Sequence, residues 1–305
     1  MDMRSIGTLQ VSVVGLGCNN FGWRLNAART REVVDAALDA GINFLDTADL
    51  YGDGASEEYL GQALAGRRSS VVIASKFGHE RSKFGKGAQP AHIRRALDGS
   101  LKRLGTDYVD LYQLHQPDPD TPIADILTTM GELVREGKVR EIGCSQFSVA
   151  QLEEAEQAVA AGAPRFVSVQ NEFSMLVREP EQGVLAECAR QGIAFLPYFP
   201  LASGMLSGKY RKGQPMPEQG RLVEGKYDQF LSARNYDIVE RLIEFAESRG
   251  RTILELAISW LLAHREVASV IAGATTAEQV RMNAAAGGWA LDEGEMRAVG
   301  ELLDG

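Results

Sequence analysis

Eight short apolar segments, separated by helical patterns, are the feature of this sequence that most constrains its fold. Each segment is almost continuously apolar and rich in β-branched or aromatic residues, whereas a strand with one face in water alternates apolar and polar positions. They span residues 11–18, 42–47, 71–76, 108–115, 139–145, 166–171, 193–198 and 268–273. We therefore predict eight parallel strands buried on both faces. Strands that alternate with helices in this way form either a closed barrel or an open doubly wound sheet.

The segments between these strands carry the start and stop signals of helices. Thr121 and Pro122, followed by Asp125, predict an N-cap, a proline at the first helical position and a capping-box carboxylate. The same spacing of capping residues recurs in Ser148 with Gln151, Thr276 with Gln279, and Asp292 with Glu295. Glycines stand where helices are expected to end, at Gly41, Gly137, Gly162, Gly192 and Gly250.

No low-complexity linker divides the chain, so we predict one α/β domain, a (β/α)8 TIM barrel, over residues 1–305. Residues 203–235 are irregular and too long for an ordinary turn between a strand and a helix, which predicts a lid-like loop after the seventh strand. The first ten residues are expected to form a small hairpin that caps one end of the barrel.

Composition narrows the class of protein. The formal net charge of −9 argues against nucleic acid or an anionic membrane surface as the main partner. The three cysteines are odd in number and form no CxxC pair, which favours a reduced, cytoplasmic setting. No apolar run reaches the roughly 18 residues of a membrane span, and the first residues do not resemble a signal peptide.

Four titratable residues stand at or just beyond the ends of three consecutive predicted strands. Asp46, Lys76 and His115 each end a strand, and Tyr51 follows Asp46 by five residues. Active sites of such barrels lie at the carboxyl ends of the strands, and neighbouring strands are only about 4.8 Å apart. Each residue alone has an ordinary structural explanation, such as a carboxylate that caps a turn. Together they predict one site, because a lysine that ends an apolar run needs a carboxylate partner.

This set suits proton donation to a carbonyl group. A nearby ammonium is expected to lower the pKa of a tyrosine from its reference value of about 10, and a carboxylate holds that ammonium in place. A neutral imidazole can orient a carbonyl by hydrogen bonding. No residue pattern supplies an activated nucleophile or a metal site. A proton donor of this kind needs a source of hydride, which means a cofactor.

Several motifs in order along the chain resemble the aldo-keto reductase family. They are residues 43–48, Tyr51 with Gly52, Ser56 with Glu57, residues 72–78, 108–115, 137–145 and 170–172, Tyr198 with Pro200 and Leu201, and residues 271–283. The resemblance implies a catalytic tetrad of Asp46, Tyr51, Lys76 and His115, and reduction of an aldehyde or ketone, or the reverse oxidation of an alcohol or sugar. The substrate is expected to be a small molecule, and the sequence does not identify it.

The resemblance also implies an extended nicotinamide cofactor across the mouth of the barrel, NADPH with NADH as the alternative. The residues implied to hold it are Ser145, Gln146, Gln170, Tyr198, Phe199, Leu201, Ser203, Gly204, Leu206, Lys209, Gly273, Thr275, Gln279 and Asn283. Gln146 and Phe199 depart from the residues usual in the family. Residues 273–280 contain no Lys or Arg for the 2′-phosphate of NADP, which predicts only a modest preference for NADPH.

We expect Asn19, Trp23 and Phe77 to border the substrate pocket. The chain ends soon after a predicted short helix, so no long loop is expected to enclose the substrate, and the pocket should be open.

Three other interpretations of the sequence compete with that of a reductase. A G-x-G at residues 15–17 suggests a Rossmann dinucleotide site, but Asn20 replaces the third glycine. Potassium-channel β subunits share the barrel and keep a cofactor, so a regulatory role with little turnover is the main alternative. A plain (β/α)8 isomerase or hydrolase is disfavoured, because no metal set or paired acid and base is apparent.

Overall fold

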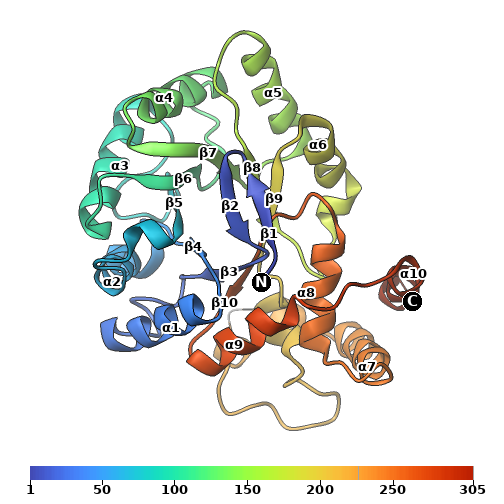
Figure 1. Ribbon diagram of the computed structural model, residues 1–305. Helices are drawn as coiled ribbons and strands as arrows, with labels where there is room; N and C mark the ends of the chain where they lie inside the picture. Colours follow the sequence, from blue (N-terminus) through green and yellow to red (C-terminus); the bar gives the residue numbers. More distant parts are fainter. Residues whose placement is uncertain (226, 305) are drawn as a thin grey trace.

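Eight parallel strands form one sheet that curves into a barrel, with helices arranged around it (Figure 1). The structure is a computed structural model that describes residues 1–225 and 227–304. The barrel strands are β3 (Val14–Gly17), β4 (Phe44–Asp46), β5 (Val72–Phe77), β6 (Val109–Leu114), β7 (Val139–Ser145), β8 (Ser168–Glu172), β9 (Ala194–Tyr198) and β10 (Val270–Gly273). They pair in the order β10-β3-β4-β5-β6-β7-β8-β9.

The two edge strands of this sheet are joined through the backbone of Phe195. Its N–H donates to the carbonyl oxygen of Glu266 at 2.7 Å, and its carbonyl accepts from the N–H of Ala268 at 3.0 Å. Because β9 and the approach to β10 meet in this way, the sheet is a nearly closed barrel rather than an open one. The predicted (β/α)8 barrel is therefore confirmed.

Ten α-helices and six shorter 3-10 helices are found in the described residues. The α-helices are α1 (Ala27–Asp39), α2 (Ala55–Ala63), α3 (Pro90–Leu104), α4 (Ile123–Arg135), α5 (Val149–Ala160), α6 (Val184–Gln191), α7 (Ala233–Glu247), α8 (Ile253–Ala263), α9 (Ala277–Ala286) and α10 (Glu293–Asp304). The 3-10 helices are η1 (Tyr51–Gly54), η2 (Arg68–Ser70), η3 (Glu179–Gln182), η4 (Ala202–Ser207), η5 (Arg221–Glu224) and η6 (Asp228–Phe230).

Most predicted helix ends are confirmed, with one correction. Ser148 and Gln151 form a complete capping box at α5. Thr276 accepts from the N–H of Gln279 at the start of α9. At α4, however, the residue in the capping position is Pro122, and the hydroxyl of Thr121 donates to Asp118 Oδ2 at 2.8 Å. Since the helix begins one residue later than expected and the Thr121 hydroxyl is directed to Asp118, the predicted Thr121 cap is wrong.

The expected N-terminal hairpin consists of β1 (Met3–Ile6) and β2 (Leu9–Ser12), which pair antiparallel. Its side chains Ile6, Leu9 and Val11 pack into the interior of the barrel against Phe44 and Leu196. The first predicted segment, residues 11–18, thus spans the end of β2 and all of β3. The hairpin seals one end of the barrel.

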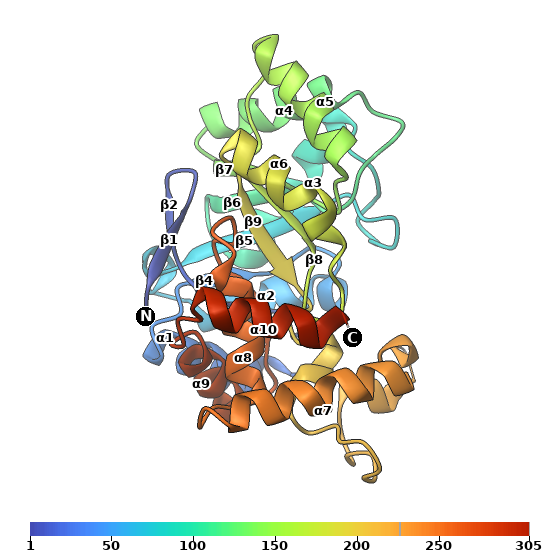
Figure 2. The ribbon, with the colours of Figure 1, turned by 90° about the vertical axis from the view of Figure 1, so that its right-hand side faces the viewer.

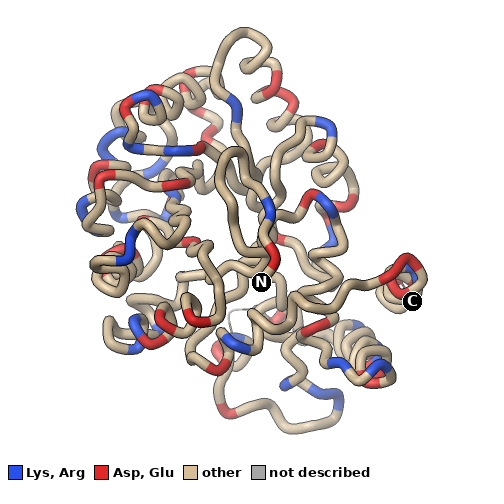
Figure 3. The backbone as a smooth tube through the Cα atoms, viewed as in Figure 1, with Lys and Arg blue, Asp and Glu red and all other residues tan. Residues whose placement is uncertain are grey.

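The described part of residues 203–235, the lid segment, lies toward the opposite end of the barrel from the hairpin (Figure 2). It contains η5, η6 and most of η4 but no α-helix until α7 begins. Figure 3 shows charged residues of both signs spread over the surrounding helices. Among the residues that the structure describes, no helix combines the length and apolar character needed to cross a bilayer.

Candidate active site

A cavity of about 1560 Å³ opens at the carboxyl ends of the barrel strands. Residues at the ends of β3, β4, β7, β9 and β10 line it, together with the loops after β5 and β6 and part of the lid segment. This is the end of the barrel away from the hairpin, as expected for the active site of such a fold.

The chain that follows β4 carries Tyr51 across the end of β5. The N–H of Thr47 donates to the carbonyl of Ala74 at 2.8 Å, and the N–H of Asp49 donates to that of Lys76 at 3.1 Å. Tyr51 then begins the turn η1, in which Gly52 has a φ of 56°. A Cβ at Gly52 would lie 2.7 Å from the carbonyl oxygen of Phe21, so this close approach requires glycine.

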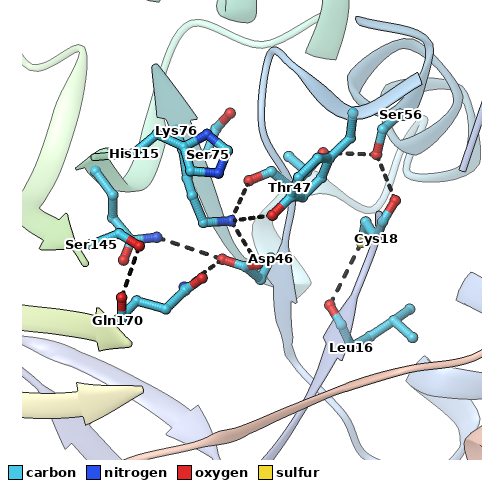
Figure 4. A network of polar contacts seen from close by, with 12 residues as sticks. Leu16, Cys18, Asp46, Thr47, Ser56, Ser75, Lys76, His115, Ser145 and Gln170 are labelled. Carbon is cyan, nitrogen blue, oxygen red and sulfur yellow. Dashed lines mark hydrogen bonds and ion pairs between the residues drawn. The ribbon is translucent and has the colours of Figure 1, made fainter. Parts of the chain in front are cut away.

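Lys76 is fully buried and its amine connects three groups of this segment (Figure 4). Its Nζ donates to Asp46 Oδ2 at 2.7 Å, to the carbonyl of Thr47 at 2.9 Å and to the hydroxyl of Tyr51 at 3.2 Å. All three protons of an ammonium are thereby used. The structure brings Asp46, Tyr51 and Lys76 together, as the strand ends predict.

The pKa values of Lys76 and Tyr51 reflect burial and mutual contact. Burial alone lowers the pKa of Lys76, but the charge of Asp46 and the contact with Tyr51 raise it above its ordinary value. Burial raises the pKa of Tyr51, and the Lys76 ammonium only partly offsets this. Lys76 therefore lowers the pKa of Tyr51 as expected, but burial outweighs this effect and the net pKa lies above its reference value. The hydroxyl is protonated and the amine is charged near neutral pH.

His115 lies at the end of β6, with its ring edge-on to that of Tyr51 at a centroid distance of 5.8 Å. Burial, followed by the charge of Lys76, holds the pKa of His115 well below its usual range. The imidazole is therefore neutral. Its Nδ1 is buried and has no hydrogen-bond partner among the described residues.

Asp46 is held through its second oxygen as well. The side-chain amide of Gln170, on β8, donates to Asp46 Oδ1 at 2.9 Å, and Gln113, on β6, approaches the same oxygen at 3.5 Å. The hydroxyl of Ser145 donates to the backbone carbonyl of Gln170 at 2.8 Å. Side chains from three other strands, β5, β6 and β8, thus fix the orientation of one carboxylate.

A second set of contacts in Figure 4 ties the Tyr51 segment to α2 and β3. The hydroxyls of Thr47 and Ser56 are 2.8 Å apart, and Ser56 Oγ donates to the carbonyl of Cys18 at 2.9 Å. The sulfur of Cys18 in turn lies 3.6 Å from the carbonyl oxygen of Leu16. The first helical turn of α2 is therefore anchored beside the candidate site.

Most residues implied to hold a cofactor line the cavity. They are Ser145, Gln146, Gln170, Tyr198, Phe199, Leu201, Ser203, Gly204, Lys209, Gly273, Thr275, Gln279 and Asn283. Among described residues other than glycine, a positive φ occurs at Gln146, Phe199, Ala202 and Ser203, and also at Asp53. Such backbone strain is concentrated at functional sites. Asn19 and Trp23 line the cavity too.

Two expected site residues lie elsewhere. Phe77 follows Lys76 in β5, so its side chain points to the other face of the strand, where it stacks on Tyr112 at 4.7 Å. Leu206 is fully buried in the core around η4. Neither residue borders the cavity. The structure therefore does not place Phe77 at the substrate pocket or Leu206 at the cofactor site, as the sequence had led us to expect. Lys76 also lies behind Tyr51 rather than on the cavity wall.

Several residues of the cavity wall could not be predicted from the sequence. Arg221, from η5, donates to the side-chain oxygens of Asn19 at 3.3 Å and Asn20 at 3.2 Å, next to the end of β10. Arg211 and Lys212 point away instead and pair with Glu240 and Asp237 on α7. A lid segment without regular periodicity gives no sign of which cation turns inward. Other missed lining residues include Arg24, Leu50, His79, Arg81 and Tyr227.

Comparison with known proteins agrees with this geometry. The family model described as the aldo/keto reductase family matches residues 13–304. An aldo-keto reductase of Schizosaccharomyces pombe, yakc [NADP(+)], is 31% identical over 313 residues, which cover 99% of this chain and 91% of that protein. A probable voltage-gated potassium channel subunit beta of Arabidopsis thaliana is 34% identical over 300 residues, covering 93% of this chain and 90% of the relative.

Among solved structures, a glycerol dehydrogenase of Gluconobacter oxydans has a TM-score of 0.86 and 28% sequence identity. The alignment covers 99% of this chain and 95% of that one. The match of a family model to nearly the whole chain, on a barrel with these strand-end residues, leads to one assignment. The chain belongs to the aldo/keto reductase family of NAD(P)H-dependent oxidoreductases.

Proposed function

We propose that this protein reduces the carbonyl group of a small aldehyde or ketone, with NADPH as the preferred cofactor and Tyr51 as the proton donor. The observation that carries the proposal is the Tyr51 hydroxyl, which lies on the cavity wall 3.2 Å from the Lys76 amine and beside a neutral His115. When bound, the reduced nicotinamide supplies the hydride. The residues of the chain supply the proton and orient the carbonyl.

The proton comes from the hydroxyl of Tyr51. As that proton leaves, negative charge develops on the phenolic oxygen, and the Lys76 ammonium stabilises it at close range. Asp46 keeps the amine charged and in place. The neutral ring of His115 carries a single proton, and with that proton on Nε2 it can donate to the carbonyl oxygen.

The wall of the cavity fits an extended dinucleotide. At about 1560 Å³ the cavity is larger than a pocket for a small substrate alone. The hydroxyl of Ser203 is buried without a hydrogen-bond partner among the described residues, in the strained segment after β9. An unpaired buried hydroxyl on a strained backbone is typical of a site that a ligand completes.

We assign the nicotinamide end to Tyr198, Ser145 and Gln170. Tyr198 is half-buried at the end of β9 and lines the cavity, and its ring is of the kind on which a nicotinamide stacks. Because the amide nitrogen of Gln170 already donates to Asp46, its oxygen is the atom left to accept from a carboxamide. The same glutamine therefore connects the cofactor site to the carboxylate that holds Lys76.

We assign the pyrophosphate to Lys209 and the 2′-phosphate of NADPH to Arg221. Both line the cavity, and neither forms an ion pair with a carboxylate of the described residues. Burial and the nearby charges of Arg24 and Arg221 lower the pKa of Lys209, which indicates a gathering of positive charge. Arg221 supplies the cation that residues 273–280 lack, so the preference for NADPH exceeds the modest one expected from the sequence alone.

We place the protein in the cytoplasm, since Cys18, Cys144 and Cys188 are all buried and unpaired. Steady-state turnover of NADPH and NADH with 4-nitrobenzaldehyde tests the proposed activity. We expect turnover with both and a higher kcat/KM with NADPH. If the protein binds NADPH but reduces no aldehyde in a broad panel, the proposal is wrong. The regulatory alternative, suggested by the name of the Arabidopsis relative, then takes its place.

A further inference from the structure

A group of buried polar residues lies behind the Tyr51 segment, on the side away from the cavity. It consists of Asp49, Glu57, Ser75, Arg103 and Tyr112, which we call the acid pocket. Asp49, Glu57, Ser75 and Tyr112 are all 0% exposed. None of the five has a part in the proposed chemistry. Asp49 and Glu57 are nevertheless two carboxyl groups in a region from which water is excluded.

The carboxylate of Glu57 is fully satisfied by its neighbours. Its Oε1 accepts from the hydroxyl of Ser75 at 2.5 Å, and its Oε2 accepts from Arg103 Nε at 2.7 Å. Arg103 reaches into the pocket from α3 and is the cation of this group. Its charge is therefore neutralised by Glu57 and not by Asp49.

Asp49 has no such partner. Neither of its carboxyl oxygens forms a hydrogen bond of normal geometry with a described residue. The hydroxyl of Tyr112, on β6, also has no hydrogen-bond partner among the described residues. The groups around it are Glu57 on α2, Arg103 on α3, Tyr112 on β6 and Ser82 in the loop after β5. Burial, with repulsion from Glu57, raises the pKa of Asp49 to about 7, although Ser82, the charge of Arg103 and the N–H of Leu50 act in the opposite direction. A charged Asp49 is thus unfavourable in this pocket.

The backbone of Asp49 is directly connected to the candidate catalytic residues. Its N–H donates to the carbonyl of Lys76 at 3.1 Å, and Asp49 lies between Thr47, which binds the Lys76 amine, and Tyr51. Ser75, which holds Glu57, immediately precedes Lys76 in β5. The backbone of Asp49 thus links the acid pocket to the positions of Tyr51 and Lys76.

We propose that Asp49 is a positioning residue whose protonated carboxyl keeps residues 46–51 in place, so that its ionisation moves Tyr51 away from Lys76 and lowers turnover. This inference rests on the proposed reductase function. It adds a proton-dependent control of that function, located in a pocket whose five residues do not line the cavity.

The test is the pH dependence of kcat with saturating NADPH and 4-nitrobenzaldehyde, for the wild-type protein, Asp49→Asn and Glu58→Gln. Asparagine keeps the shape of the neutral acid but cannot ionise. Glu58 is the exposed neighbour of Glu57 on α2, so its replacement is a matched control. In the wild type and in Glu58→Gln, we expect kcat to fall roughly tenfold between about pH 7 and about pH 8.5, as for loss of one essential proton.

Asp49→Asn should keep its neutral-pH kcat across the same range, with KM for NADPH unchanged. The other groups near the site do not explain such a fall, because the pKa of Tyr51 and that of Lys76 are raised and that of His115 is lowered. An alkaline fall that persists in Asp49→Asn, or a wild-type kcat that stays flat, overturns the inference. A wild type that is inactive at every pH contradicts the proposed function instead.

A measurement on the wild type alone covers the case in which Asp49→Asn fails to fold. In protein labelled with ¹³C at the aspartate carboxyl groups, one resonance should titrate near pH 7, well above the others. If all aspartate carboxyl groups titrate in the ordinary range below about pH 5, Asp49 is not protonated at neutral pH and the inference is wrong.

Discussion

At the scale of single residues, the candidate site is defined by where protons reside before the reaction. Tyr51 keeps its proton because burial outweighs the nearby ammonium, whereas Lys76 keeps its charge because Asp46 outweighs burial. His115 remains neutral next to that charge. An acid and a neutral hydrogen-bond donor therefore face one cavity, with a fixed positive charge directly behind the acid, and each can be removed separately.

Replacement of Tyr51 by Phe should abolish carbonyl reduction and leave cofactor binding nearly intact. The ring still fills its place beside His115, but the proton is gone, and general acid catalysis typically contributes about 10²–10⁴-fold. Steady-state kinetics with 4-nitrobenzaldehyde and fluorescence titration with NADPH measure the two effects. If the variant retains more than about a tenth of the wild-type kcat, Tyr51 is not the proton donor.

Replacement of Lys76 by Met should be equally damaging to activity and should also destabilise the fold. Asp46 loses its cation in a buried position, and breaking such a pair typically costs about 3–5 kcal/mol of unfolding free energy. Adding Asp46→Asn to the Lys76→Met variant removes the unpaired buried charge, so the double variant should regain much of that stability but none of the activity. Urea unfolding and kcat distinguish these two roles. Full activity in Lys76→Met would mean that Lys76 is only a structural charge.

At the scale of elements, the strands and their ends could be predicted, whereas the lid segment could not. Eight apolar segments identified eight strands because burial on both faces leaves a clear pattern, and strand ends located Asp46, Lys76 and His115. Phe77 was misplaced because β5 continues one residue beyond the predicted end, so alternation turns its side chain outward. In the lid segment the short helices have no such period, and tertiary contacts alone turn Arg221 inward.

The lid segment should contribute to cofactor choice through Arg221. In Arg221→Gln we expect KM for NADPH to rise about tenfold to a hundredfold, because a hydrogen bond to a charged group contributes about 1.5–3 kcal/mol, and KM for NADH to change little. Arg234→Gln, at an exposed position on α7, is the control. Equal losses with both cofactors would assign Arg221 to a shared phosphate rather than to the 2′-phosphate.

At the scale of the whole molecule, the candidate site depends on the closed barrel. The single carboxylate of Asp46 is held from β5, β6 and β8, so no local segment contains the site. For that reason the sequence could indicate which residues meet, but not which of them are protonated and which are charged. The acid pocket illustrates this limit. Asp49 and Glu57 look like ordinary loop and helix acids until packing of α2 and α3 against β5 and β6 buries them.

Burial of Asp49 should also make the stability of the whole protein depend on pH. Its pKa rises from 3.8 to about 7 on folding. Between these values the unfolded chain has released the proton and the folded chain still holds it. The free energy of unfolding therefore falls as pH rises through this window and levels off above about pH 7. A shift of about three pKa units corresponds to roughly 4 kcal/mol.

Asp49→Asn removes this titration, so urea unfolding of both proteins from about pH 5 to about pH 8.5 checks the prediction. The depressed pKa of His115 acts in the opposite sense, with stability lost as pH falls below about 6.5. Both proteins keep His115, so its contribution cancels in the difference between them. That difference should increase in favour of Asp49→Asn up to about pH 7 and then remain constant. A difference independent of pH would mean that Asp49 ionises as readily in the folded protein as in the unfolded chain.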